Sequence, residues 1–119
     1  MTDKKELLQL IIEGIQERKG HNITIVDMTH IDTTPTSNFV IAEGTSTTQV
    51  EAIAESVSEY VRKNSGVKPY NADGLGNSEW VVMDYGDIWV HIFMPETRRR
   101  YSLEELWSDA QIREIPDLD

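Results

Sequence analysis

The stretch that decides the fold is Trp80-Val-Val-Met-Asp-Tyr-Gly-Asp-Ile-Trp-Val-His-Ile-Phe-Met94. It is rich in β-branched and aromatic residues, which are typical of strands, and a single turn signal interrupts it. Tyr85-Gly86 is the predicted two-residue connection, because glycine readily adopts the positive φ of a tight hairpin turn. Asp84 and Asp87 flank this connection and can hydrogen-bond its backbone. The stretch therefore predicts a β-hairpin.

Side chains alternate between the two faces of this hairpin. With the two-residue loop, Met83 pairs with Ile88, and the face that predicts core carries Val81, Met83, Ile88, Val90 and Ile92. The other face carries Trp80, Val82, Trp89, His91 and Phe93. If no helix covers this second face, it is a large apolar patch that predicts a partner site, and if a helix covers it, it is more core. A three-residue loop would shift the register by one and reassign the faces of one strand.

The rest of the chain interleaves helical and strand patterns. Apolar residues at helical spacing predict a first helix capped by Asp3 and a second that begins at Ser46. A short helix is expected after Ser102, and residues 23–27, 39–42 and 67–70 predict three further strands. The predicted fold class is α/β (α+β), with a mixed five-stranded sheet packed by helices. Residues 1–110 are expected to form one domain, and residues 111–119 a loose acidic tail.

Composition limits the function classes. The chain has 119 residues with 21 acids and 11 bases, and its formal net charge of -10 argues against direct, sequence-specific nucleic-acid binding. The charge allows a basic protein partner, and the alternative is that it only provides solubility. Cysteine is absent, which excludes disulfides, thiolate metal sites and cysteine nucleophiles. No long apolar run follows the N-terminus, so we expect a cytoplasmic protein without a membrane segment.

The sharpest catalytic candidate is Gly44-Thr45-Ser46, because backbone N–H groups at a helix N-terminus can hold phosphate. A nucleotidyltransferase would also need carboxylates that hold magnesium, whereas Asp84 and Asp87 lie on opposite sides of a turn. No lysine follows the loop as in a P-loop, so an ordinary helix cap is the favoured interpretation.

The three histidines, His21, His30 and His91, show no metal-ligand spacing. We therefore predict no enzyme activity, no catalytic residue, no metal and no cofactor. The basic cluster Arg98-Arg99-Arg100 has two interpretations, which are surface pairing with nearby glutamates and a docking patch beside the aromatic strand face.

The hairpin, together with Glu96, Arg98, Tyr101 and the Leu-Glu-Glu-Leu-Trp of residues 103–107, resembles the signature of the Iojap/RsfS family, the ribosomal silencing factors. Residues 37–46, Ser-Asn-Phe-Val-Ile-Ala-Glu-Gly-Thr-Ser, are similar to the other block of that family. The resemblance extends from the first predicted helix to about Ala110. The family usually has Asp at the position of Asn38 and Glu-Gly at Asp73-Gly74.

The resemblance implies a nucleotidyltransferase-like fold without established enzymatic activity. It also implies binding to the fourteenth protein of the large ribosomal subunit at the intersubunit face. Docking there would block subunit joining and repress translation when nutrients are scarce, and the free protein would be a homodimer. From the arithmetic of the strand faces, the predicted anchor is Trp80, Trp89, His91 and Phe93. Its predicted rim is Asp84, Tyr85, Arg98, Arg99, Arg100 and Tyr101.

Overall fold

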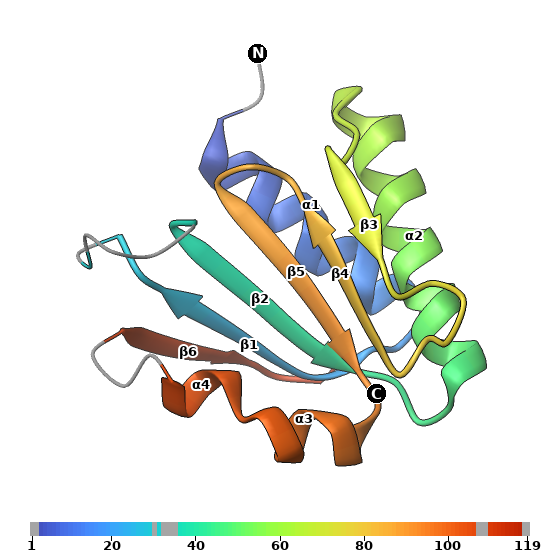
Figure 1. Ribbon diagram of the computed structural model, residues 1–119. Coiled ribbons are helices and arrows are strands. Elements are labelled where there is room, and N and C mark those ends of the chain that lie inside the picture. The colour runs from blue at the N-terminus through green and yellow to red at the C-terminus, as the bar shows by residue number, and fades with distance from the viewer. Residues whose placement is uncertain (1–2, 30, 32–35, 107–109, 118–119) are drawn as a thin grey trace.

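The computed structural model, which describes residues 3–29, 31, 36–106 and 110–117, contains a six-stranded mixed sheet with helices on both faces (Figure 1). The helices are α1 (Lys4–Glu17), α2 (Thr47–Ser65), α3 (Pro95–Tyr101) and α4 (Leu103–Leu106). The strands are β1 (His21–Asp27), β2 (Asn38–Glu43), β3 (Asn71–Asp73), β4 (Trp80–Asp84), β5 (Ile88–Phe93) and β6 (Gln111–Ile115). The predicted mixed α/β class is confirmed, with six strands and not five.

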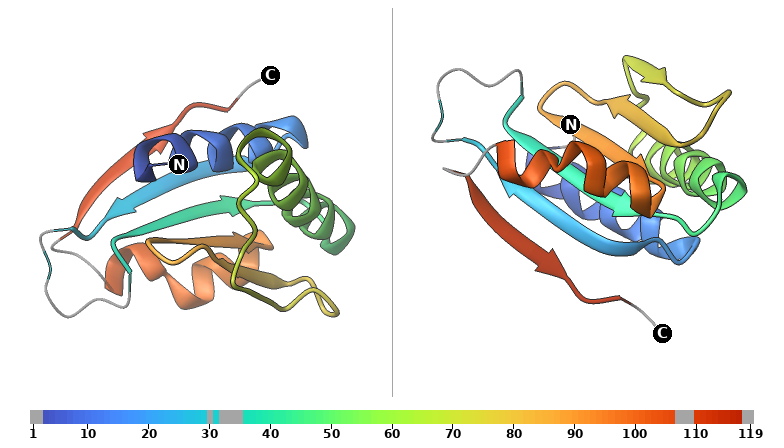
Figure 2. Two further views of the ribbon diagram at one scale, coloured as in Figure 1. Left: turned by 90° about the horizontal axis from the view of Figure 1, so that it is seen from above. Right: turned by 60° about the horizontal axis from the view of Figure 1, so that its bottom comes forward.

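The strand order is β3-β4-β5-β2-β1-β6. Only β2 and β5 pair in parallel, and the other neighbours are antiparallel. α1 and α2 cover one face of the sheet, whereas α3 and α4 lie across the other (Figure 2). None of the helices in these ranges is long and apolar enough to cross a membrane.

The two long helices form as their sequence pattern predicts. Asp3 accepts a hydrogen bond from the Glu6 N–H at 2.8 Å, and Ser46 accepts one from the Gln49 N–H at 3.1 Å. Each helix buries one apolar stripe, with Ile11 of α1 and Val57 of α2 wholly inside. Burying a side chain of this size contributes about 1.5–3 kcal/mol, so the stripes hold both helices against the sheet.

The predicted hairpin is present, but its turn lies one residue further along. The Tyr85 N–H donates to the Ile88 carbonyl at 2.9 Å, so the two-residue connection is Gly86-Asp87. Gly86 has a φ of +88°, and its N–H donates to the Asp84 carboxylate. Met83 therefore pairs with Val90 and not with Ile88. Because the pairing shifts by two, every side chain keeps its predicted face.

Three segments differ from the sequence prediction. Residues 111–115, expected in a loose tail, form β6 by pairing with the open edge of β1. The strand expected at residues 67–70 starts at Asn71, because Pro69 cannot donate to a ladder. The basic residues 98–100, where no helix is predicted, lie within α3, which begins at Pro95.

Ser102, after which a short helix is expected, divides the C-terminal helical segment into α3 and α4. Ser102 ends α3 with a φ of +44°, and its hydroxyl donates to the Arg99 carbonyl rather than capping α4. Trp107, part of the family-like segment, lies outside the described residues.

We expect Gly14→Ala to destabilise the protein. A Cβ at Gly14 would lie 2.9 Å from the Val57 Cα, so α1 and α2 would have to separate. Overpacking of this kind costs about 1–3 kcal/mol, against a gain in helix propensity of about 1 kcal/mol. Urea unfolding followed by circular dichroism measures the difference. The control is Gly76→Ala, where no atom lies within 4 Å of the added methyl group. Equal unfolding midpoints for both variants would contradict the close approach.

Candidate functional site

Five rings lie on the sheet face opposite α1 and α2. They are Phe39 of β2, Trp80 of β4, and Trp89, His91 and Phe93 of β5, and we call them the aromatic face. Their centroids are close, at 4.6 Å for Phe39 and His91 and 5.0 Å for Trp80 and Phe93. Strand alternation brings the four hairpin rings together, as the sequence predicts, and the pairing of β2 with β5 adds Phe39, which was not predicted there.

The aromatic face is covered at one end and open at the other. Tyr101 of α3 packs on Trp80 with centroids 4.6 Å apart, and Leu103 packs on the same cluster. Phe93 is 1% exposed and His91 4% exposed, so both are core and neither offers its side chain to a partner. These two predicted anchor residues are therefore wrong as surface contacts, because the chain's own elements cover them.

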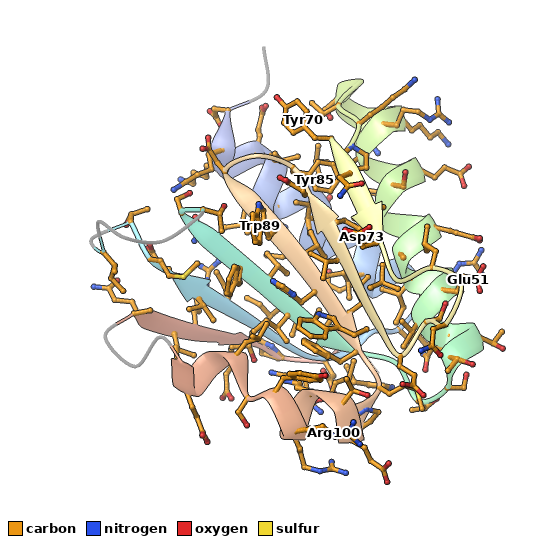
Figure 3. All side chains as sticks on the ribbon, viewed as in Figure 1. Glu51, Tyr70, Asp73, Tyr85, Trp89 and Arg100 are labelled. Carbon is orange, nitrogen blue, oxygen red and sulfur yellow. The ribbon has the colours of Figure 1, made fainter. Side chains whose placement is uncertain are left out.

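The open end contains Trp89 and Val82, both half-buried, and two carboxylates, Asp73 of β3 and Asp84 of β4. Figure 3 shows Trp89 on β5 and Asp73 on β3, with β4 between them. We call Asp73, Val82, Asp84 and Trp89 the open patch. An apolar ring flanked by acids, at a point of the sheet that none of the four described helices covers (Figure 1), suits a basic protein surface.

His91 holds the boundary between the covered and open ends. Its Nδ1 accepts a hydrogen bond from the Trp80 Nε1–H at 3.1 Å, which fixes the angle of the indole. The neutral ring then carries its proton on Nε2, which is buried and has no hydrogen-bond partner within the described ranges. Burial lowers the pKa of His91 from 6.5 to about 4. The ring is therefore neutral near pH 7 and orients Trp80.

Tyr85 was predicted at the rim of the aromatic face, but it lies on the opposite side of the sheet. It is 5% exposed and packs in the core beside α1 and α2. Burial raises the pKa of its phenol, whose oxygen has no hydrogen-bond partner in the described part of the chain. Its position follows from alternation, because Asp84 and Tyr85 must point to opposite faces.

Arg98 joins α3 to the sheet. Its guanidinium donates to the Asn22 carbonyl at 2.6 Å, to Glu43 at 2.9 Å and to the Thr24 hydroxyl at 2.8 Å. The Arg98 side chain is only 12% exposed, so it is a clamp within the fold and neither predicted interpretation holds for it. Sequence reasoning missed Glu43 as its partner, since no local signal connects residues 55 positions apart.

The two neighbouring arginines differ from Arg98. Arg99 and Arg100 are exposed, and neither forms an ion pair within the described ranges. Tyr101 follows them at 46% exposure. These three residues present a basic and aromatic strip on α3, beside the covered end of the aromatic face.

Hydrogen bonds with nearby side chains already engage the backbone of the Gly44–Ser46 loop and the start of α2. The Thr45 N–H donates to the Gln49 side-chain carbonyl at 2.6 Å, and the amide of Gln49 donates to the carbonyls of Arg18 and Lys19. The N-terminus of α2 is thus capped internally, which favours the ordinary cap over the phosphate site. No group of three His, Cys, Asp or Glu residues in the described ranges could hold a metal, and His30 lies outside them.

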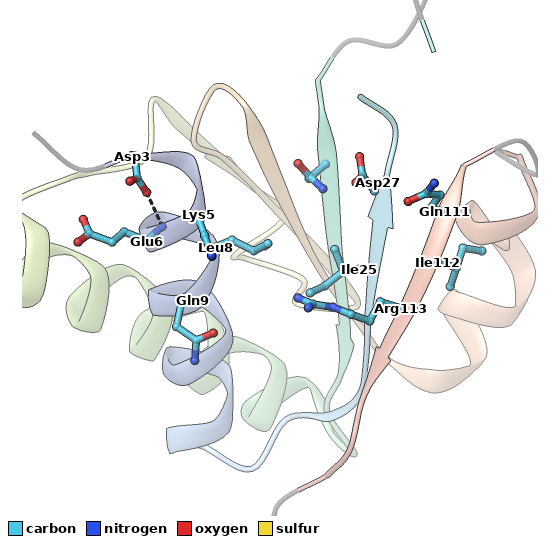
Figure 4. A pocket seen from close by; sticks show the side chains of 11 residues that line it. Asp3, Lys5, Glu6, Leu8, Gln9, Ile25, Asp27, Gln111, Ile112 and Arg113 are labelled. Carbon is cyan, nitrogen blue, oxygen red and sulfur yellow. Dashed lines mark hydrogen bonds between the residues drawn. The ribbon is translucent and has the colours of Figure 1, made fainter. Parts of the chain in front are cut away.

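A hollow of about 660 Å³ lies between α1 and β6 (Figure 4). Lys5 and Arg113 lie on opposite walls (Figure 4), and the lining also contains the acids Asp3, Glu6 and Asp27. Two of these acids are already engaged, because Asp3 caps α1 and Asp27 accepts hydrogen bonds from Thr29. The hollow therefore pairs no nucleophile with a base, and we assign no chemistry to it.

The comparisons with known proteins agree with the resemblance. Residues 1–119 match the family model RsfS, described as ribosomal silencing factor during starvation. A ribosomal silencing factor RsfS of Halalkalibacterium halodurans is 33% identical over 111 residues, covering 93% of each chain. The mouse protein named mitochondrial assembly of ribosomal large subunit protein 1 is 27% identical over 114 residues, covering 91% of this chain and 50% of its own. A crystal structure from Chromobacterium violaceum superposes with a TM-score of 0.83 at 33% identity, covering 90% of this chain and 88% of that one.

We expect Arg98→Ala to lower the free energy of unfolding by about 2–4 kcal/mol. The variant loses three hydrogen bonds and leaves the Glu43 carboxylate, 15% exposed, without its cation. Arg100→Ala is the control, because an exposed arginine without an ion pair should change stability by less than about 0.5 kcal/mol. Chemical unfolding monitored by tryptophan fluorescence separates the two, and equal losses would refute the clamp.

Stability should depend on pH through His91. Because its pKa is lowered in the folded protein, the unfolded chain takes up a proton between pH 6.5 and 4 that the folded chain does not. The free energy of unfolding should therefore fall as the pH falls through this window, by up to about 3 kcal/mol from this group. In His91→Gln that component disappears, whereas His21→Gln, at a half-buried site outside the aromatic face, keeps it. If the free energy of unfolding depends on pH in the same way for wild type and His91→Gln, folding does not lower the pKa of His91.

Proposed function

The chain belongs to the ribosomal silencing factor (RsfS) family, and on that premise we propose that it represses translation by binding the large ribosomal subunit. The family match over the whole chain carries this proposal. The name of the similar mouse protein refers to assembly of the large subunit, which supports the choice of subunit.

The partner we propose is the fourteenth protein of the large subunit, at the intersubunit face. A 119-residue protein docked there would occupy space that the small subunit needs, so repression is steric and transforms no substrate. The names of the matched bacterial relatives are those of silencing factors, which supports a function without catalysis. Such a factor works in the cytoplasm, where bacterial ribosomes assemble, and its release under rich conditions would restore subunit joining.

The surface we propose for docking is the open patch. Trp89 is its half-buried ring, and a partly exposed aromatic side chain is a frequent anchor of protein interfaces. Asp73 and Asp84 give the patch a negative rim, which matches a basic ribosomal protein and opposes rRNA phosphates. His91, which pairs with Val82, supports the patch from inside. Arg99 and Arg100 lie on α3 at the covered end of the aromatic face and form a separate basic strip, apart from the open patch (Figure 3).

The proposed function predicts that Trp89→Ala weakens binding to isolated large subunits. An anchor of this kind contributes about 2 kcal/mol or more, so the dissociation constant should rise by roughly 30-fold. Co-sedimentation measures binding, and sucrose gradients measure the fraction of joined ribosomes.

Ile112→Ala on β6 is the matched control, because Ile112 is 48% exposed and lies at the far edge of the same sheet face. If wild type binds and both variants bind equally well, Trp89 is not the anchor. If the wild type in excess neither binds the subunit nor reduces joining, the proposed function fails. Light scattering of Trp89→Asp shows whether the homodimer that we propose for the free protein uses the same patch.

A further inference from the structure

An apolar groove of about 340 Å³ lies between α2 and β3, away from the aromatic face. Its apolar lining consists of Ala54, Pro69, Ala72, Leu75 and Met83. Met83 belongs to the core cluster beneath α1 and α2, which places the groove on the helical side of the sheet. Leu75 is 39% exposed, so the groove opens to solvent with an apolar wall.

Two carboxylates form one side of this groove. Glu55 and Glu59 are exposed, and neither forms an ion pair or hydrogen bond within the described ranges. They are four residues apart on α2, which separates them by about 6 Å along the helix axis. Figure 3 shows that Glu51, one turn earlier, also points away from the sheet.

The other side of the groove is a sheet edge. β3 is the outermost strand, and Asn71, Ala72 and Asp73 are all exposed. In the described part of the chain no strand pairs with the outward edge of β3, so its backbone groups are available to an extended chain.

We propose that this groove docks an extended basic segment of a partner protein. One apolar side chain fills the groove, and the two basic side chains that flank it reach Glu55 and Glu59. Alternate residues of an extended chain are about 6.6 Å apart, close to the spacing of the two glutamates. In an extended chain the flanking side chains leave on the side opposite the apolar one, so their long, flexible stems reach back over the rim of the groove to the exposed Glu55 and Glu59.

The negative charge of the groove favours a basic protein segment over nucleic acid or a second copy of this chain. Nucleic acid is repelled by the two glutamates, which have only Arg62 beside them in the lining. A second copy of this chain carries a net charge of -10, and its exposed Arg99 and Arg100 lie within helix α3 and not in an extended segment. The groove lies on the other face of the sheet from the open patch, so the proposal does not depend on the proposed ribosomal function.

The test uses three capped peptides and amide chemical-shift mapping of the full chain. The probe is Gly-Ser-Lys-Leu-Lys-Ser-Gly, and its controls replace both lysines with glutamate or the leucine with glycine. We expect the probe to shift the amides around Ala54–Glu59 and Ala72–Leu75, with weaker binding at high salt. No shifts, shifts confined to the aromatic face, or equal binding of either control peptide would overturn the proposal.

A charge-reversed variant gives the second readout. Glu55→Lys/Glu59→Lys should raise the dissociation constant of the probe roughly fivefold or more, because two rim contacts become repulsive. Glu79→Lys/Glu114→Lys makes the same change in net charge at exposed positions outside the groove and should bind nearly as wild type. The same loss in both variants would mean that net charge, and not the groove, attracts the peptide.

Discussion

The parallel pairing of β2 with β5 is the contact on which the rest of the structure depends. Two adjacent strands in the same direction need a long crossover, which α2 and the β3–β4 ribbon supply. The pair lies at the centre of the sheet and, apart from the end at Trp89, is covered on both faces, so both strands consist almost entirely of buried side chains. α1 and α2 cover one face, and the outer face is left for the shorter α3 and α4.

Local sequence patterns predicted the elements that depend only on neighbouring residues. Alternation fixed which hairpin residues share a face, and capping residues fixed where α1 and α2 begin. The turn was misplaced by one residue because Gly86 can be either member of a two-residue loop, and only the Tyr85 to Ile88 hydrogen bond distinguishes the two. β6 was not predicted because it forms by pairing with the edge of β1, which is a tertiary effect. Its five residues are mostly polar or exposed and show no strand pattern of their own.

The candidate site shows the same division. The sequence identified four of the five rings of the aromatic face, but neither Phe39 of β2 nor how far α3 would cover the rings. Both predicted alternatives hold in part, since Phe93 and His91 are core whereas Trp89 borders solvent. Arg98 was grouped with its neighbours because the three share a residue type, and the structure separates them by what each guanidinium reaches.

The hydrogen bonds of Arg98 to β1 and β2 also set the time scale on which the buried rings, such as Phe93, become exposed to solvent. A simple rotamer change of Trp80 or Tyr101, which takes nanoseconds, does not uncover Phe93 while α3 stays fastened to β1 and β2. Baring that ring requires α3 to detach as a cooperative unit, which is a rare opening event of the kind that hydrogen exchange records. The rings beneath α3 can therefore contact another molecule only during such an opening event.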